Sequence, residues 1–143
     1  MLTGILFSIL AGTMIALQGI FNARMGDEVG LWHTNSFVHG TGFLVAFFIL
    51  IFNEKLNLAS IKDVPPYYLL GGVMGVIIIL SVMKGIGEIG ASYSVTIVII
   101  TQIILTAGVN YFGFFGEPVI TFSLTKIIGL VLMISGILVY QLS

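Results

Sequence analysis

Residues 1–23, MLTGILFSILAGTMIALQGIFNA, contain no Asp, Glu, Lys or Arg, and four later stretches of the chain share this property. The hydrocarbon core of a bilayer is about 30 Å thick, so a helix needs about 20 apolar residues, with a range of about 17–25, to cross it. All five stretches reach this range. We therefore predict an all-α integral membrane protein with five transmembrane helices, and an odd number of spans places the two termini on opposite sides of the membrane. The later stretches are residues 29–53, 64–83, 89–116 and 127–143.

The composition supports the same interpretation. Of 143 residues, 58% are hydrophobic and 8% are charged, whereas soluble domains average about 25% charged residues. This length favours a single five-helix transmembrane domain, residues 1–143. Between the spans we expect a polar turn at residues 24–28, a tight glycine connection at 85–90 and a loop at 112–124. The helices are expected at about 2–22, 31–52, 67–86, 91–111 and 125–142.

Several function classes are disfavoured by what the chain lacks. Five basic and six acidic residues leave it close to neutral, without the dense basic face that binds nucleic acid. It has no cysteine, which excludes disulfides and thiolate chemistry. It also has no nucleophile–base pairing, no ligand cluster of metal spacing and no phosphate-binding loop. We therefore expect no enzyme, no cofactor, no metal site and no nucleic-acid partner, with membrane lipid around the chain.

The basic residues are divided almost evenly between the two sides of the membrane. Lys55, Lys62 and Lys126 share one side in this topology, and Arg24 and Lys84 share the other. Orientation follows the bias of Lys and Arg between the sides, which is nearly absent here. We therefore predict insertion in both orientations and an antiparallel homodimer, the unfused counterpart of the inverted repeats of many transporters. The alternative is a paired homologous subunit, encoded separately, that fixes one orientation.

Small residues predict where helices approach closely, because helices in lipid associate mainly by packing over such residues. Gly71 and Gly75 form a GxxxG pair, and a stripe of small residues follows one side of the first span. Gly129 and Gly136 are seven residues apart on one stripe of the last span. We predict that this last stripe packs against a second protomer; the alternative is packing within one protomer.

Polar side chains within the spans are the candidate functional residues, because polar groups are costly at membrane depth. They form three pairs with a spacing of four residues, so each pair shares a helix face. We expect these faces to meet and to line a polar substrate pathway near the dimer axis. His39 could also bind a proton, since His titrates near neutral pH. The alternative is hydrogen bonding between helices without any ligand. The pairs are Gln18 and Asn22, Asn35 and His39, and Gln102 and Thr106, the last continued by Asn110.

A fourth pair is charged. Lys84 and Glu88 are four residues apart at the end of the third span, a spacing that allows an ion pair, although Lys before Glu is the weaker order. The functional interpretation is a charged lip on the substrate pathway, hinged by Gly85, Gly87 and Gly90. The alternative is two interfacial side chains whose charged ends reach the headgroup region.

Four segments together carry a family resemblance that runs over nearly the whole chain. They are Leu10–Asn22 (LAGTMIALQGIFN), Asn35–Gly42 (NSFVHGTG), the Thr101-Gln102 pair followed by Asn110-Tyr111-Phe112-Gly113, and Gly129–Gly136 (GLVLMISG). Their order and spacing resemble those of the YdcZ family of the drug/metabolite transporter superfamily. The resemblance implies a five-helix unit that is one half of a ten-helix, drug/metabolite-transporter-like dimer, and a role in transport. It implies no particular substrate.

These observations together predict a membrane transporter in the plasma (inner) membrane of a bacterium or archaeon. It would move a small polar or zwitterionic solute by alternating access as a dual-topology antiparallel homodimer. Two alternatives stay open: a dual-topology small-anion channel, and a non-transporting membrane scaffold protein.

Overall fold

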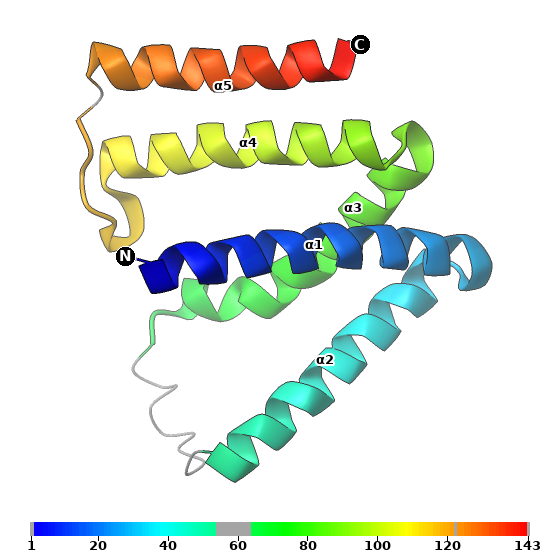
Figure 1. Ribbon diagram of the computed structural model, residues 1–143. Coiled ribbons are helices and arrows are strands. Elements are labelled where there is room, and N and C mark those ends of the chain that lie inside the picture. Colours follow the sequence, from blue (N-terminus) through cyan, green and yellow to red (C-terminus); the bar gives the residue numbers. More distant parts are fainter. Residues whose placement is uncertain (1, 54–63, 122, 143) are drawn as a thin grey trace. The chain divides into compact units, whose positions relative to one another are not determined.

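The computed structural model describes residues 2–53, 64–121 and 123–142, and these residues form helices joined by short connections (Figure 1). Five helices are long and apolar enough to cross a membrane, with the 3-10 turn η2 and α3 together forming the third span. This confirms the predicted all-helical, multi-pass architecture. The elements are α1 (Leu2–Val29), α2 (Leu31–Asn53), η2 (Pro66–Leu70), α3 (Gly71–Ile89), α4 (Ala91–Phe112), η3 (Phe114–Gly116) and α5 (Leu124–Leu142).

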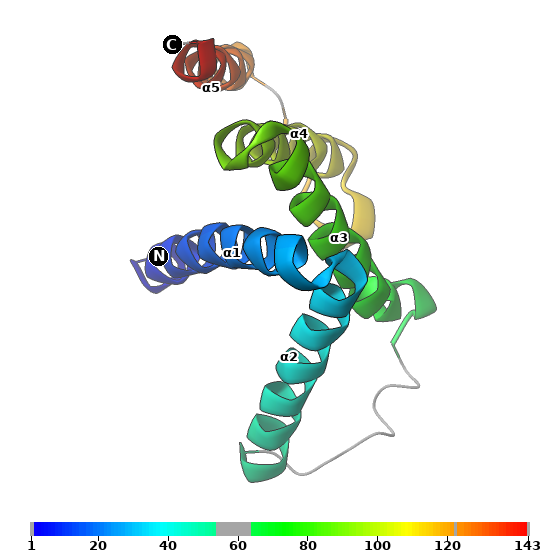
Figure 2. The same cartoon turned by 90° about the vertical axis from the view of Figure 1, so that its right-hand side faces the viewer.

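The chain divides into two compact units, Met1–Glu88 and Ile89–Ser143, which we describe separately. The first unit contains α1, α2 and α3, and the second contains α4 and α5. In Figures 1 and 2, α2 leaves the carboxyl end of α1 and diverges from it. A single domain and a ten-helix dimer stay predictions.

Two helices end later than expected. The predicted polar turn at residues 24–28 is instead the last turn of α1, which continues to Val29. Arg and Glu are good helix formers, and the Arg24–Asp27 ion pair, with 3.5 Å between Nη1 and Oδ2, lies within this turn. Helix α1 is followed by Gly30, whose φ of +91° reverses the chain.

The expected glycine connection at residues 85–90 is also mostly helix. Helix α3 runs through Gly85 and Gly87 to Ile89, and Gly90 alone, with a φ of +82°, separates it from α4. Continued helix satisfies the backbone N–H and C=O groups at the membrane boundary, which a longer loop would leave open. The predicted connection at Gly85 and Gly87 is therefore wrong, whereas the hinge role of these glycines stays a prediction.

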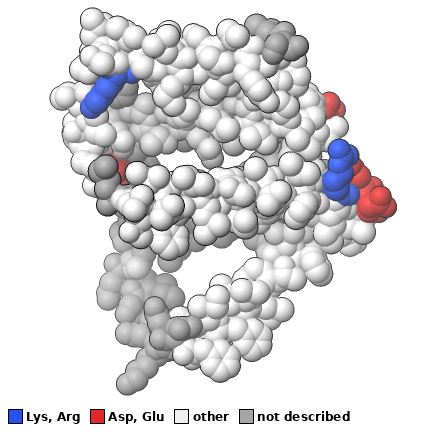
Figure 3. All heavy atoms as spheres, in the orientation of Figure 1, with Lys and Arg blue, Asp and Glu red and all other residues white. Residues whose placement is uncertain are grey.

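The side chains are arranged as expected for helices in lipid. Large apolar residues are exposed along every span; Phe7, for example, is 67% exposed. Figure 3 shows long uncharged surfaces on the visible face, with the charged side chains near helix ends. Of the few buried side chains among the described residues, four are polar and three are apolar. They are Ala23, Met83 and Ile86 on the apolar side, and Asn22, Thr34, Asn35 and Ser94 on the polar side.

Helices α4 and α5 form an antiparallel hairpin, joined by a connection that folds back on the end of α4. Gly113 has a φ of +64° and donates its backbone N–H to the carbonyl oxygen of Val109, which caps α4. A Cβ atom added at Gly113 would lie 2.7 Å from Cγ2 of Val119, so glycine is required here. The N–H of Ile120 then donates to the carbonyl oxygen of Asn110 at 3.0 Å, which holds the returning chain against the helix end.

Candidate functional site: polar side chains on the membrane-spanning helices

Helix α1 approaches α3 closely at a glycine on its stripe of small residues. A Cβ atom added at Gly19 would lie 3.3 Å from Cγ1 of Val82 and 3.5 Å from Cδ1 of Ile86. Near the end of α1, a Cβ atom added at Gly26 would lie 3.0 Å from Cδ2 of Leu31 and 3.6 Å from Sδ of Met83. The carboxyl ends of α1 and α3 and the amino end of α2 therefore converge.

The first predicted pair lines a pocket beside this contact. Gln18 and Asn22 face a cavity of about 50 Å³ between α1 and α3, whose other walls are mainly apolar residues of α3. Asn22 is 7% exposed, whereas Gln18 is exposed. The two side chains also border a shallower hollow of about 400 Å³ on the surface of α1. They are thus polar groups beside a small, largely apolar space.

The second predicted pair lies where α2 crosses α3. Asn35 is 2% exposed, and its Nδ2 donates to the backbone carbonyl oxygen of Val76 at 2.8 Å. Its Oδ1 is buried and has no hydrogen-bond partner among the described residues. One turn further, Nδ1 of His39 lies 3.0 Å from the backbone carbonyl oxygen of Asn35. The side chain of His39 faces Gly75, where an added Cβ atom would lie 3.1 Å from Nε2.

The third predicted pair lies in the second unit. Gln102 and Thr106 are both exposed on α4. Thr106, Asn110 and Glu117 border a pocket of about 280 Å³ at the carboxyl end of α4. The sequence interpretation missed Glu117, which the fold-back after Gly113 brings to this helix end. Because the two units are described separately, the meeting of the three polar faces stays a prediction.

A polar cluster joining α4 to α5 was also missed. Oε1 of Gln141 accepts hydrogen bonds from Oγ of Ser92 at 3.3 Å and from Oγ1 of Thr96 at 3.2 Å. The hydroxyl group of Tyr93 donates to the backbone carbonyl oxygen of Gln141 at 3.3 Å. The signal in the sequence was the Ser-x-x-x-Thr spacing at the start of the fourth span, which places both hydroxyl groups on one helix face.

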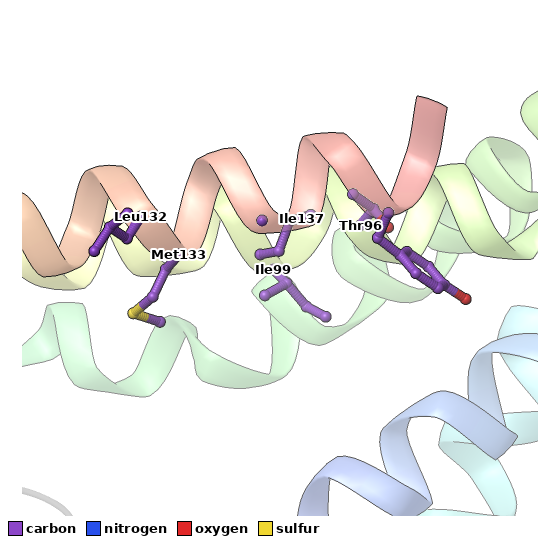
Figure 4. Close-up of a pocket in the computed structure, with 7 residues that line it drawn as sticks. Thr96, Ile99, Leu132, Met133 and Ile137 are labelled. Atoms are coloured by element: carbon purple, nitrogen blue, oxygen red, sulfur yellow. The ribbon is translucent and has the colours of Figure 1, made fainter. Parts of the chain in front are cut away.

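Next to this cluster, an open groove of about 400 Å³ lies between α4 and α5. Figure 4 shows Thr96 and Ile99 of α4 opposite Leu132, Met133 and Ile137 of α5. The groove walls are almost entirely apolar.

The glycines predicted to pack against a second protomer are open in this structure. Gly136 borders the groove between α4 and α5. A Cβ atom added at Gly129 or at Gly136 would have no heavy-atom neighbour within 4 Å among the described residues. The stripe of Gly129 and Gly136 therefore has room for another helix to pack against it. That this helix belongs to a second protomer stays a prediction.

The predicted charged lip lies at the end of α3. Lys84 and Glu88 are both exposed, and no ion pair joins them in the part of the chain that the structure describes. The described residues also contain no group of three His, Asp or Glu side chains that could hold a metal ion. What the geometry offers is hydrogen bonding by uncharged amides and an imidazole within apolar spans.

Comparison with known proteins identifies a family. The model of a protein family described as "Putative inner membrane exporter, YdcZ" matches residues 3–139. Neither the curated proteins nor the solved structures include a match to this chain. The match confirms the family resemblance that the sequence motifs indicated.

Proposed function

The chain belongs to the YdcZ family, and from this premise we propose that it transports a small polar or zwitterionic solute across the inner membrane of a bacterium or archaeon. One observation carries the proposal beyond the family's description: uncharged amides are buried between spans that are otherwise apolar. Asn22 and Asn35 are 7% and 2% exposed. Such groups are costly in a membrane protein unless they bind something, either another helix or a ligand.

The chemistry of these side chains suggests the class of solute. Amide groups donate and accept hydrogen bonds but carry no charge, and the second and third spans contribute no carboxylate between residues 29 and 53 or between 64 and 83. A solute with balanced charge, or with polar groups only, fits such a pathway better than an ion of one sign. Gln18, Asn22, Asn35, His39, Gln102 and Thr106 are the proposed pathway residues, with Lys84 and Glu88 at its charged lip.

For the mechanism we propose alternating access by an antiparallel homodimer. The nearly even division of Lys and Arg between the two sides supports insertion in both orientations. Lys55 and Lys62, on which this count depends, lie outside the described residues. Two oppositely inserted copies would exchange roles as the dimer rocks, so that its inward-open and outward-open forms are related by symmetry.

Uptake into proteoliposomes tests the transport role. Purified protein would be reconstituted and offered a panel of labelled polar and zwitterionic solutes, with protein-free liposomes as the blank. For a solute that is taken up, Gln18→Ala should lower the initial rate about tenfold at equal reconstitution, which corresponds to about 1.4 kcal/mol. Ser8→Ala is the matched control, because Oγ of Ser8 on the same helix donates to the backbone carbonyl oxygen of Gly4 within that helix.

Each alternative function predicts a different outcome. Rapid, non-saturating efflux of a small anion would favour the channel. No flux of any solute, together with tolerance of apolar substitutions at Gln18 and Gln102, would favour the scaffold. Unchanged uptake by Gln18→Ala would remove this residue from the pathway.

Labelling of both termini tests the dimer. Tags at the two ends of the same protein would be probed with a membrane-impermeant reagent in intact cells and in inside-out vesicles. Dual topology predicts that each terminus is labelled from both faces. Labelling of each terminus from a single face would contradict the antiparallel homodimer, and the transport role could still hold with a separately encoded partner.

A further inference from the structure

The crossing of α2 and α3 presents two hydrogen-bond acceptors one helical turn apart, and we infer that they bind the ammonium group of a zwitterionic solute. The acceptors are Oδ1 of Asn35 and Nε2 of His39. The inference deepens the proposed function and rests on it, because it takes the bound group to be part of the transported solute.

The first acceptor is fixed by the geometry of Asn35. Its Nδ2 donates to the carbonyl oxygen of Val76 at 2.8 Å, which sets the orientation of the planar amide. Oδ1 is therefore directed away from that carbonyl oxygen, and it is buried without a partner among the described residues. An unsatisfied oxygen in a nearly fully buried side chain is costly, so the site is complete only when a donor reaches it.

The second acceptor follows from the tautomer of His39. Its Nδ1 lies 3.0 Å from the backbone carbonyl oxygen of Asn35, and a carbonyl oxygen can only accept. Nδ1 therefore carries the hydrogen, and in the neutral ring Nε2 has its lone pair free. Both acceptors belong to α2 at positions four apart, which places them on the same face of the helix.

Gly75 of α3 lies directly against the second acceptor. A Cβ atom added at Gly75 would lie 3.1 Å from Nε2 of His39, closer than ordinary van der Waals contact. Any larger residue at position 75 would press on the imidazole nitrogen that the inference needs. At Gly71, one turn earlier on the same helix, an added Cβ atom would meet no heavy atom within 4 Å in the part of the chain that the structure describes.

Oδ1 of Asn35 and Nε2 of His39 can both accept a hydrogen bond. A ligand that binds both of them must therefore donate more than one hydrogen bond. A primary ammonium group has three N–H donors, whereas a carboxylate has none. The charge of the ligand is limited as well, because residues 29–53 and 64–83 contain no acidic side chain to neutralise a lone cation. A solute that carries its own carboxylate together with its ammonium group meets both conditions.

The test is ¹⁵N NMR of the full chain in lipid nanodiscs, with only the histidines labelled. The probes are glycine and its N,N,N-trimethyl derivative, which is an equally zwitterionic molecule without N–H donors. Glycine should shift the Nε2 resonance of His39 in a saturable manner, and trimethylglycine should not. His33, exposed at the start of α2, is the internal control and should stay unchanged.

Variants locate the site by the same measurement. Asn35→Leu removes the first acceptor, together with the hydrogen bond to Val76, at similar volume and should weaken glycine binding at least tenfold. Gly75→Ala should have a comparable effect, and the matched variant Gly71→Ala should have none. If Asn35→Leu does not fold, the paired glycine variants still decide the question.

The inference is overturned if glycine leaves His39 unchanged, which would mean that only a water molecule satisfies Oδ1, or if trimethylglycine binds equally well. It is also overturned if Gly71→Ala and Gly75→Ala behave alike. Its failure is distinguishable from failure of the proposed function. Uptake of another solute without glycine binding would support the transport role and reject the ammonium site. Glycine binding without uptake of any solute would support the ammonium site and reject the transport role.

Discussion

The helices of the first unit and the hairpin of the second are held together in different ways. In the first, α1 and α3 touch at Gly19, and the amide of Asn35 ties α2 to the backbone of α3 at 2.8 Å. In the second, the described contacts between α4 and α5 include the hydrogen bonds of Gln141 at one end of the hairpin. The glycines of α5 have open space beside them.

This difference indicates where each unit can still accept a partner. Without a hydrophobic driving force in lipid, close packing over small residues is the main source of helix association. The first unit already uses part of its small residues internally, while the α5 stripe remains unused. Matched pairs of variants can test that contrast, in order of decreasing effect on the stability of the protomer.

The glycine contact of the first unit should be the most sensitive site. Gly19→Leu would press on Val82 and Ile86 of α3 and should lower the free energy of unfolding by up to about 3 kcal/mol. Gly12→Leu, in open space on the same helix, should change it by less than about 0.5 kcal/mol. Unfolding in detergent mixtures of increasing SDS fraction measures both. Equal losses at the two positions would refute a specific α1–α3 contact.

The connection between α4 and α5 should come next. Gly113→Ala combines a left-handed backbone with a contact of 2.7 Å to Val119 and should cost about 2 kcal/mol. Gly116→Ala has a similar φ of +80° but open space, so it should cost only about 1 kcal/mol. The same SDS titration compares the two, and a larger loss for Gly116→Ala would contradict the fold-back at Gly113.

The hydrogen bonds of Gln141 should contribute less. A double-mutant cycle with Thr96→Val and Gln141→Leu should give a coupling free energy of about 0.6 kcal/mol, typical of hydrogen bonds between helices in membranes. Thr101→Val should show no coupling to Gln141→Leu, because Oγ1 of Thr101 bonds to the carbonyl oxygen of Ile97 in its own helix. Coupling at Thr101 as strong as at Thr96 would argue against the cluster.

The smallest effect on protomer stability is expected on α5. Gly129→Leu and Gly136→Leu should change the free energy of unfolding by less than about 0.5 kcal/mol, since no heavy atom of a neighbouring element among the described residues lies within 4 Å of either Cβ position. They should nevertheless lower the dimer fraction measured by cross-linking in liposomes. Val131→Leu, on the opposite face of α5, is the control. An unchanged dimer fraction in both glycine variants would show that the two protomers do not pack through this stripe.

The sequence was informative where the signal is local. Helices α2 and α4 end within a residue or two of their predicted bounds, because span length follows from uncharged stretches and bilayer thickness. It was less informative at the ends of α1 and α3. There, charged and glycine residues were interpreted as turns, yet the helix continues until a single glycine with positive φ.

Contacts between helices were the part that the sequence left undecided. The polar spacing identified Asn35 and His39 as a pair, but nothing local indicated that Val76 and Gly75 of α3 would face them. Gln141 was overlooked because its partners are more than forty residues away. Similarly, Gly75 packs against a side chain while Gly71 does not, although both belong to one GxxxG pair.

The sequence alone determined that the chain spans a membrane five times and belongs among YdcZ-like proteins, because hydrocarbon excludes charge wherever a helix must cross it. Which of the many small and polar residues meet became visible in the folded chain. In lipid every apolar helix face is equally well solvated, so the choice of neighbour depends on close contacts and hydrogen bonds that the order of residues does not reveal.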